Sequence, residues 1–136
     1  MKLKQATVLF VEDEPFLRET MGAWLEQKAG RAFCAEHGAE ALAILAANKI
    51  DLLISDVRMP VMDGIQLVKK LNQAGTERPR VILITGFSDL SLPQAHDLGI
   101  DAVVEKPVDR KELLNVIQRS LARPDEIGKN ITPRPV

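Results

Sequence analysis

Residues 51–64 read Asp-Leu-Leu-Ile-Ser-Asp-Val-Arg-Met-Pro-Val-Met-Asp-Gly, and this stretch decides the fold class. The run at 51–54, apolar after its first residue, is too short for a helix and does not alternate with polar residues. It therefore indicates a strand buried on both faces of a parallel sheet. Asp56 follows the run, and Asp63-Gly64 closes a loop before a segment with helical spacing. This order predicts one unit of an α/β fold.

Similar runs lie on both sides of this stretch, at residues 7–11, 81–84 and 102–104, with a weaker run at 31–36 that suits an edge strand. The segments between them have apolar stripes at helical spacing: Leu17, Met21, Trp24 and Leu25; Leu42, Leu45 and Ala46; Ile65, Val68 and Leu71; Leu113, Ile117 and Leu121. Pro93 predicts that a further helix is short, beginning at 91 or 92 and ending near Gly99. Five strand–helix alternations predict an open doubly wound sheet.

The composition is that of an ordinary globular domain: 136 residues, 46% hydrophobic and 27% charged, with 18 basic and 19 acidic residues. We expect one domain at 1–121 and a flexible tail or linker stub at 122–136, where three prolines and two isolated isoleucines cannot form a packed element. The balanced charge offers no general attraction to nucleic acid or membranes. With a single cysteine, Cys34, and no apolar stretch of bilayer length, we expect a cytoplasmic protein that binds neither nucleic acid nor membrane directly.

Polar side chains follow four of the predicted strands at their carboxyl ends, where ligands bind in open α/β sheets. Glu12 and Asp13 follow the first strand, Asp56 the third, Thr85 the fourth and Lys106 the fifth. Each residue alone has an ordinary explanation as a helix cap or a solvated loop residue. Together, three carboxylates, a hydroxyl and an ammonium at one sheet edge predict a functional site.

The chemistry of this set points to phosphoryl transfer. Close carboxylates raise one another's pKa and destabilise the fold unless a cation neutralises them. Mg²⁺ suits them because it prefers a few carboxylates plus water and leaves positions for phosphate oxygens. Beside such a metal, Asp56 is a nucleophile able to form an aspartyl phosphate. Lys106 and the Thr85 hydroxyl would neutralise the phosphoryl oxygens.

Four stretches closely resemble the response-regulator receiver family of two-component signalling: VLFVEDE at 8–14, LISDVRMPVMDG at 53–64, ITG at 84–86 and EKP at 105–107. The resemblance runs from about Ala6 to Leu121. It implies a flavodoxin-like fold, in which a five-stranded parallel sheet of order 2-1-3-4-5 carries five helices. It also implies a phosphoprotein of bacterial phosphorelay signalling.

The resemblance further implies a role for each site residue. Asp56 would accept a phosphoryl group from a histidine kinase or phosphotransfer protein. Asp13, Asp56 and the Arg58 carbonyl would ligate Mg²⁺, with Glu12 close to the metal through water, and the threonine and lysine of the same edge would contact phosphoryl oxygens. The chain would catalyse only its own phosphorylation and dephosphorylation. It would switch an unknown output partner or output domain, as a monomer or weak dimer.

Three alternatives remain. A phosphatase using an aspartyl phosphate would carry a second aspartate two residues after Asp13, where this chain has Pro15. A mononucleotide-binding protein would have a glycine-rich turn after the first strand, where residues 12–14 are all acidic and would repel phosphate. A receiver-like interaction module working without phosphorylation is the stronger alternative. Its support is Val103, which stands where many receivers carry Tyr or Phe.

Two conformational expectations accompany the resemblance. The Lys106–Pro107 peptide should be cis, which would aim the ammonium back into the site. Because Val103 removes the aromatic half of the receiver switch, the loop after Thr85, including Gly86, Phe87 and Ser88, and the short helix begun near Pro93 should report phosphorylation instead.

Overall fold

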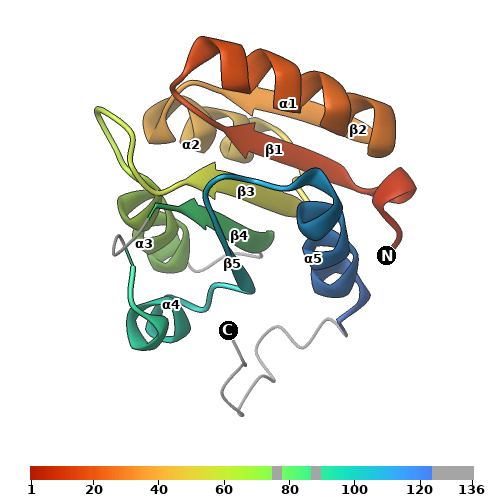
Figure 1. Cartoon of the computed structure of the whole chain (residues 1–136). Coiled ribbons are helices and arrows are strands. Elements are labelled where there is room, and N and C mark those ends of the chain that lie inside the picture. The colour runs from red at the N-terminus through yellow and green to blue at the C-terminus, as the bar shows by residue number, and fades with distance from the viewer. Residues whose placement is uncertain (75–77, 87–89, 124–136) are drawn as a thin grey trace.

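The computed structural model of the chain describes residues 1–74, 78–86 and 90–123. Its strands are β1 (Thr7–Val11), β2 (Arg31–Ala35), β3 (Leu52–Asp56), β4 (Arg80–Thr85) and β5 (Ala102–Glu105). They form a parallel sheet in the order β2-β1-β3-β4-β5 (Figure 1). The expected strand order is therefore confirmed, with the weaker strand β2 at an edge.

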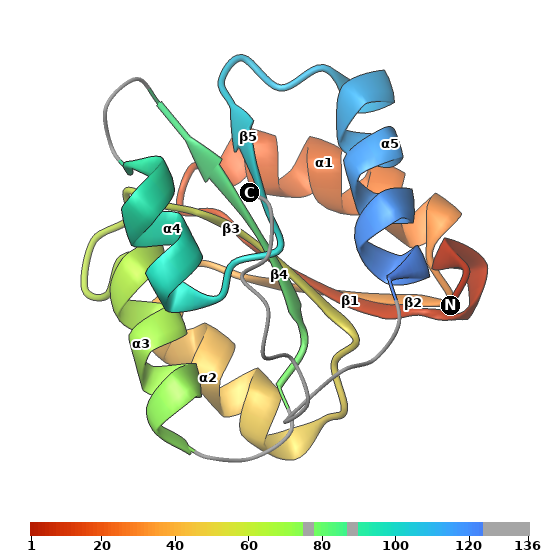
Figure 2. The ribbon, with the colours of Figure 1, turned by 90° about the horizontal axis from the view of Figure 1, so that it is seen from below.

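Helices cover both faces of the sheet. α1 (Pro15–Lys28) and α5 (Arg110–Ala122) lie on one face, and α2 (Gly38–Ala47), α3 (Gly64–Ala74) and α4 (Leu92–Leu98) lie on the other (Figure 2). A short 3₁₀ helix, η1 (Leu3–Gln5), precedes β1. Helices on both faces of a parallel sheet are the predicted doubly wound architecture.

The sheet separates two hydrophobic clusters, and its central strands contribute to both. Leu9, Leu53 and Leu83 belong to the cluster that contains residues of α2, α3 and α4. Alternate residues such as Ile54 and Ile82 belong to the cluster that contains residues of α1 and α5. Because successive side chains of a strand point to opposite faces, burial on both faces demands an uninterrupted apolar run. This is why the predicted runs do not alternate with polar residues.

Three details of the predicted burial are wrong. Ala46, expected on the buried stripe of α2, is exposed. Leu17 was expected on the buried stripe of α1, but it is 45% exposed. α1 begins beyond the carboxyl end of β1, so its first turn has no strand to pack against, whereas Leu25 further along is fully buried. The run at 102–104 is buried fully only at Val104, because β5 is an edge strand with a neighbour on one side.

The helix boundaries follow the sequence signals closely. The Ser91 hydroxyl caps α4 by accepting a hydrogen bond from the Gln94 amide at 3.1 Å, and the helix stops at Gly99, whose φ is +72°. α5 ends at Ala122, one residue past the expected domain boundary. The expected tail from residue 124 onward lies outside the described residues. Of the described helices, none is long and apolar enough to cross a membrane.

Candidate functional site

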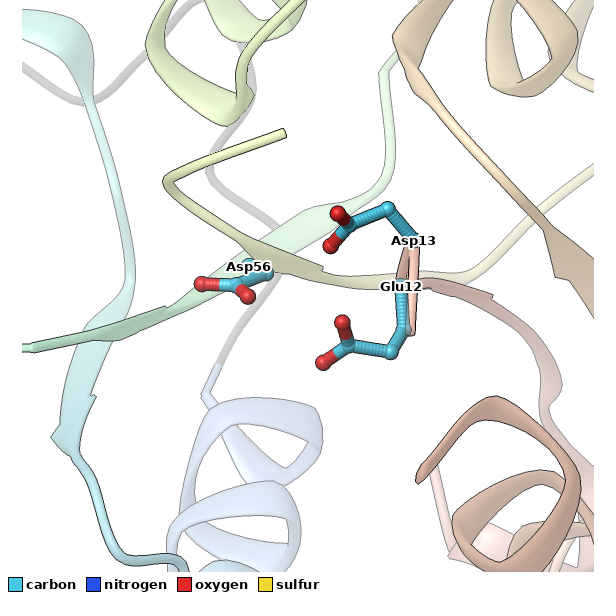
Figure 3. Close-up of side chains that lie close together, drawn as sticks. All are labelled: Glu12, Asp13 and Asp56. Atoms are coloured by element: carbon cyan, nitrogen blue, oxygen red, sulfur yellow. The ribbon is translucent and has the colours of Figure 1, made fainter. Parts of the chain in front are cut away.

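Three carboxylates converge where β1 and β3 end. The two strands pair with Val11 opposite Ser55, so Glu12 and Asp56 are the next residues along them. Their carboxylates and that of Asp13 are gathered at this edge (Figure 3), with one ligand oxygen from each within 4.8 Å of the others. Glu12 and Asp56 are buried and Asp13 is exposed. The structure therefore brings together the acidic residues that the sequence singled out.

Lys106 reaches this acidic cluster (Glu12, Asp13 and Asp56) from the end of β5. Its Nζ donates a hydrogen bond to Asp56 Oδ2 at 2.8 Å, and the Lys106–Pro107 peptide is cis, as expected. Burial lowers the pKa of Lys106, but the hydrogen bond and charge of Asp56, with the charges of Glu12 and Asp13, raise it more. Lys106 therefore stays a cation at neutral pH.

The carboxyl group of Glu12 has a raised pKa. Burial raises the pKa of its carboxyl group, the hydrogen bond from the Glu14 amide lowers it, and the charge of Asp56 and a hydrogen bond with Asp13 raise it again. The resulting pKa is about 7. One ammonium thus leaves the three carboxylates short of positive charge, and the cluster favours taking up a proton or a further cation.

The acidic turn at 12–14 connects β1 to α1. The Glu12 amide donates to the Ala35 carbonyl at 3.0 Å, which holds the start of the turn against the end of β2. The Glu14 carboxylate caps α1 by accepting a hydrogen bond from the Leu17 amide at 2.7 Å. Both ends of the turn are therefore tied to regular structure.

Arg18 lies behind the same turn, although the sequence pattern did not single it out. Its Nη1 donates to the backbone carbonyls of Glu12 at 3.0 Å and Asp13 at 3.3 Å. Its Nη2 lies 3.6 Å from Glu36 Oε1 in the loop between β2 and α2. The signal that could have identified it is its spacing, because a residue early in α1 can fold back onto the turn that precedes the helix.

The loop between β3 and α3 is closed tightly against the site. The Gly64 amide donates to the Val57 carbonyl at 2.8 Å, and a Cβ at Gly64 would lie 2.5 Å from the Asp56 carbonyl oxygen, so only glycine permits this approach. Val61 has a φ of +70°, which is costly for a β-branched residue. Arg58, the expected carbonyl ligand, is exposed in this loop.

Thr85 ends β4, the strand next to β3. It is buried, and its hydroxyl donates to the Gly86 carbonyl at 2.6 Å. Val103 packs against the hydrophobic cluster on the α2, α3 and α4 face. Phe87 and Ser88, which were expected to report phosphorylation, lie outside the described residues.

The acidic cluster fits a small divalent cation. Neighbouring ligands of octahedral Mg²⁺ are roughly 3 Å apart and opposite ones roughly 4 Å apart, a span that oxygens within 4.8 Å of one another can reach with small movements. Asp13 is exposed, so water and phosphate oxygens have access to the remaining positions. Across residues 1–74, 78–86 and 90–123, no other group of three acidic, His or Cys side chains has metal-binding spacing.

The family model of the response regulator receiver domain matches residues 8–118. The transcriptional regulatory protein GlrR of Escherichia coli (strain K12) is 36% identical over 121 residues, which cover 89% of this chain and 27% of GlrR. The DNA-binding transcriptional regulator NtrC of the same organism is 32% identical over 125 residues, which cover 91% of this chain and 26% of NtrC. The chain thus spans about a quarter of the length of these curated relatives.

A solved structure extends the likeness to the fold. The response regulator protein TrrA of Thermotoga maritima, crystallised in complex with Mg²⁺-BeF, is 27% identical with a TM-score of 0.74. The match covers 89% of this chain and 100% of that chain. In the family-model match, residues 8–118 include Lys106 and the whole acidic cluster.

Proposed function

The chain belongs to the response regulator receiver domain family, and from this premise we propose that Asp56 is the residue that accepts the phosphoryl group. As a receiver domain of two-component response regulators, it is a signalling phosphoacceptor. The observation that carries the proposal is the 2.8 Å contact of Lys106 with Asp56, whose buried carboxylate lies at the end of the central strand beside two further carboxylates. A module working without phosphorylation is not favoured.

Asp13, Asp56 and the Arg58 carbonyl would hold Mg²⁺, with Glu12 close to it through a water. The raised pKa of Glu12 supports this, because a cluster short of positive charge gains from binding a cation. The Mg²⁺-BeF complex of TrrA supports the choice of metal. When bound, Mg²⁺ supplies positive charge both to the carboxylates and to the incoming phosphoryl oxygens.

Asp56 provides the nucleophile. A carboxylate oxygen forms a bond to phosphorus as the bond between phosphorus and the donor breaks. For a phosphohistidine donor this is a P–N bond, whose electron pair returns to the imidazole. The negative charge of the carboxylate is lost in the acyl phosphate, and the three phosphoryl oxygens bring new charge to the same place. In this way the chain catalyses only its own phosphorylation and, by attack of water, its dephosphorylation.

Lys106 and Thr85 respond to this movement of charge. The Lys106 ammonium, bound to Asp56 before the reaction, can follow the charge to a phosphoryl oxygen. The Thr85 hydroxyl donates to the Gly86 carbonyl, so it must turn to reach the phosphoryl group. The loop that follows β4 would then change its conformation, which hydrogen exchange across residues 86–93 would detect.

The donor in this proposal is a histidine kinase or phosphotransfer protein, and the recipient of the signal is an output partner or an output domain. NtrC is a DNA-binding regulator, but the net charge of −1 for this chain supports no direct role in binding nucleic acid. We further propose a cytoplasmic protein that acts as a monomer or weak dimer.

Intact-mass measurement after incubation with phosphoramidate and Mg²⁺ tests the assignment. Wild type should gain one phosphoryl group, and Asp56→Ala should gain none. Asp63→Asn is the matched control, because Asp63 lies in the same loop but accepts a hydrogen bond from the Gln66 amide at 2.8 Å outside the acidic cluster. Modification that persists in Asp56→Ala, or that needs no divalent cation, would sink the proposal.

A further inference from the structure

We propose that Arg18 is a positioning residue for the metal site: its guanidinium fixes the backbone of Glu12 and Asp13 so that their carboxylates converge toward Asp56. This inference rests on the proposed function, because it concerns the same Mg²⁺ site. The side chain itself is turned toward the backbone of the turn and toward Glu36, with 21% of its surface exposed.

The contacts of Arg18 concentrate on one turn. A single nitrogen, Nη1, donates to two successive carbonyl oxygens, at 3.0 Å to Glu12 and 3.3 Å to Asp13. The Arg18 amide also donates to the Glu14 carbonyl at 2.9 Å, as the first turn of α1 forms. The carbonyls of all three residues in the acidic turn are thus bound by the same arginine, two through its side chain and one through its backbone.

The interaction of the second guanidinium nitrogen, Nη2, with Glu36 is weaker than the carbonyl contacts of Nη1. Nη2 lies 3.6 Å from Glu36 Oε1, and the Glu36 side chain is 61% exposed. Exposed ion pairs of this kind contribute little because water and salt screen them. The carbonyl contacts, and not this ion pair, therefore carry the positioning role.

The acidic turn needs such a clamp because its side chains repel one another. Before a cation binds, the negative charges of Asp13 and Asp56, and that of Glu12 above pH 7 where it ionises, favour conformations in which the turn moves its carboxylates apart. The direction of a side chain follows from its backbone, so binding the carbonyls restrains the carboxylates too. A site held in its binding geometry loses less conformational entropy when the metal arrives.

Arginine suits this task better than lysine. Its planar guanidinium offers five N–H donors in a rigid fork, whereas an ammonium is a single flexible point of charge. Lysine at position 18 would keep the positive charge near the cluster, but its Nζ ends one bond short of the arginine Nη1 on a flexible stem and would not hold both carbonyls in the same way. Comparing arginine with lysine at position 18 therefore distinguishes the effect of side-chain geometry from the effect of positive charge.

The test compares Arg18→Met and Arg18→Lys with two controls, Glu36→Gln and Lys28→Met. Glu36→Gln removes only the exposed ion pair, and Lys28→Met removes one positive charge from the last turn of α1. Titration calorimetry gives the Mg²⁺ dissociation constant. Hydrogen exchange without metal reports the amides of residues 12–14.

We expect Arg18→Met to bind Mg²⁺ about 10-fold more weakly, as residues that support metal ligands typically do, with faster exchange at 12–14. Arg18→Lys should recover only part of the affinity, and both controls should match wild type. Wild-type affinity in Arg18→Met, full recovery in Arg18→Lys, or equal weakening in Glu36→Gln would each overturn the inference. If Arg18→Met does not fold, Arg18→Lys decides. A wild-type chain that neither binds Mg²⁺ nor accepts a phosphoryl group would instead refute the proposed function.

Discussion

The two ends of the sheet differ in how much positive charge lies near their carboxylates. At the carboxyl end, three carboxylates share the single ammonium of Lys106. At the amino end, one carboxylate, Asp101, has two guanidinium groups, with its Oδ1 3.9 Å from Arg80 Nη1 and 3.5 Å from Arg123 Nη1. Its Oδ2 also accepts a hydrogen bond from the Val81 amide at 2.8 Å.

This difference distinguishes a binding site from a set of ion pairs that stabilises the fold. Asp101 is fully compensated, and the groups around it join the starts of β4 and β5 to the end of α5, where Arg80 also donates to the Arg123 carbonyl at 2.7 Å. The acidic cluster has only the Lys106 ammonium against three carboxyl groups, and the pKa of Glu12 rises to about 7 as a result of burial and of the charge of Asp56. An uncompensated cluster gains from binding a cation and a phosphoryl group, whereas the compensated carboxylate has no charge left to satisfy.

The sharpest way to test the comparison is to remove one cation from each end. Lys106→Ala should slow phosphorylation of Asp56 by about 10²–10³-fold, because it removes a preorganised donor to the phosphoryl oxygens. Arg123→Ala should leave the rate unchanged within about twofold, since it acts on fold stability alone. Rates are followed by intact mass with phosphoramidate and Mg²⁺, below the melting temperature of each variant. Equal slowing in both variants would show that the two ends are not independent.

Removing one carboxylate from each end should have opposite effects on stability. Asp101→Ala should lower the free energy of unfolding by about 3 kcal/mol, because it removes the carboxylate that two guanidinium groups and the buried Val81 amide share. Without Mg²⁺, Asp56→Ala should instead raise stability, since it relieves repulsion within the cluster. Urea unfolding measures both, and a destabilised Asp56→Ala would contradict the account of the carboxyl end.

The raised pKa of Glu12 predicts an unusual pH dependence at the carboxyl end. In the absence of metal, the folded chain holds a proton on Glu12 up to about pH 7, whereas the unfolded chain releases it near the ordinary glutamate pKa of 4.5. The folded state binds more protons between these values, so this contribution to stability is complete below pH 4.5 and is lost as the pH rises to about 7.

Between pH 4.5 and about 7, the free energy of unfolding of wild type should fall by on the order of 2 kcal/mol relative to that of Glu12→Gln. Unfolding curves of the two proteins at several pH values provide the measurement. Saturating Mg²⁺ should reduce the difference, because the metal competes with the proton for the same cluster. Parallel curves for wild type and Glu12→Gln would show that Glu12 titrates normally.

The smallest effect expected is the stabilisation by Mg²⁺ itself. At fivefold excess over its dissociation constant, the gain should be about 1 kcal/mol. Asp13→Asn should remove most of this gain, whereas Asp101→Asn, at the other end of the sheet, should keep it. Melting temperatures with and without Mg²⁺ measure the increments. A gain that survives Asp13→Asn would place the bound metal elsewhere.

Much of the fold could be predicted because a buried strand or helix face requires a recognisable pattern of apolar residues within a short stretch of sequence. β3 is buried at every residue, and the run that forms it is apolar up to Ser55. Pro93 predicted that α4 begins at 91 or 92, and the Glu14 cap with Pro15 shows the same kind of local signal at the start of α1, since caps and prolines act within one turn of the chain. The acidic cluster was predictable for a related reason, because parallel strands all end at the same edge.

Contacts between segments far apart in the chain produce no such local pattern and could not be predicted. Leu17 fits the apolar periodicity of α1 but is exposed, because periodicity does not reveal where the sheet ends beneath the helix. The partners of Asp101 come from positions 80, 81 and 123, and no local pattern connects them. The Arg18 guanidinium contacts the turn at Glu12 and the loop at Glu36, which come together only after α1 and β2 have packed.

The sequence by itself therefore determined the order of strands and helices, the family, and the set of acidic and basic residues at the carboxyl edge. The order of the elements along the chain and the placing of these residues follow from short-range rules of burial, capping and chain direction, whereas the family follows from the resemblance of four motifs. The tertiary structure decided how each charge is compensated: one ammonium for the acidic cluster, two guanidinium groups for Asp101, and backbone carbonyls for Arg18. The physical reason is that electrostatic and hydrogen-bond energies depend on distances of a few ångströms between groups far apart in the chain, and only packing sets those distances.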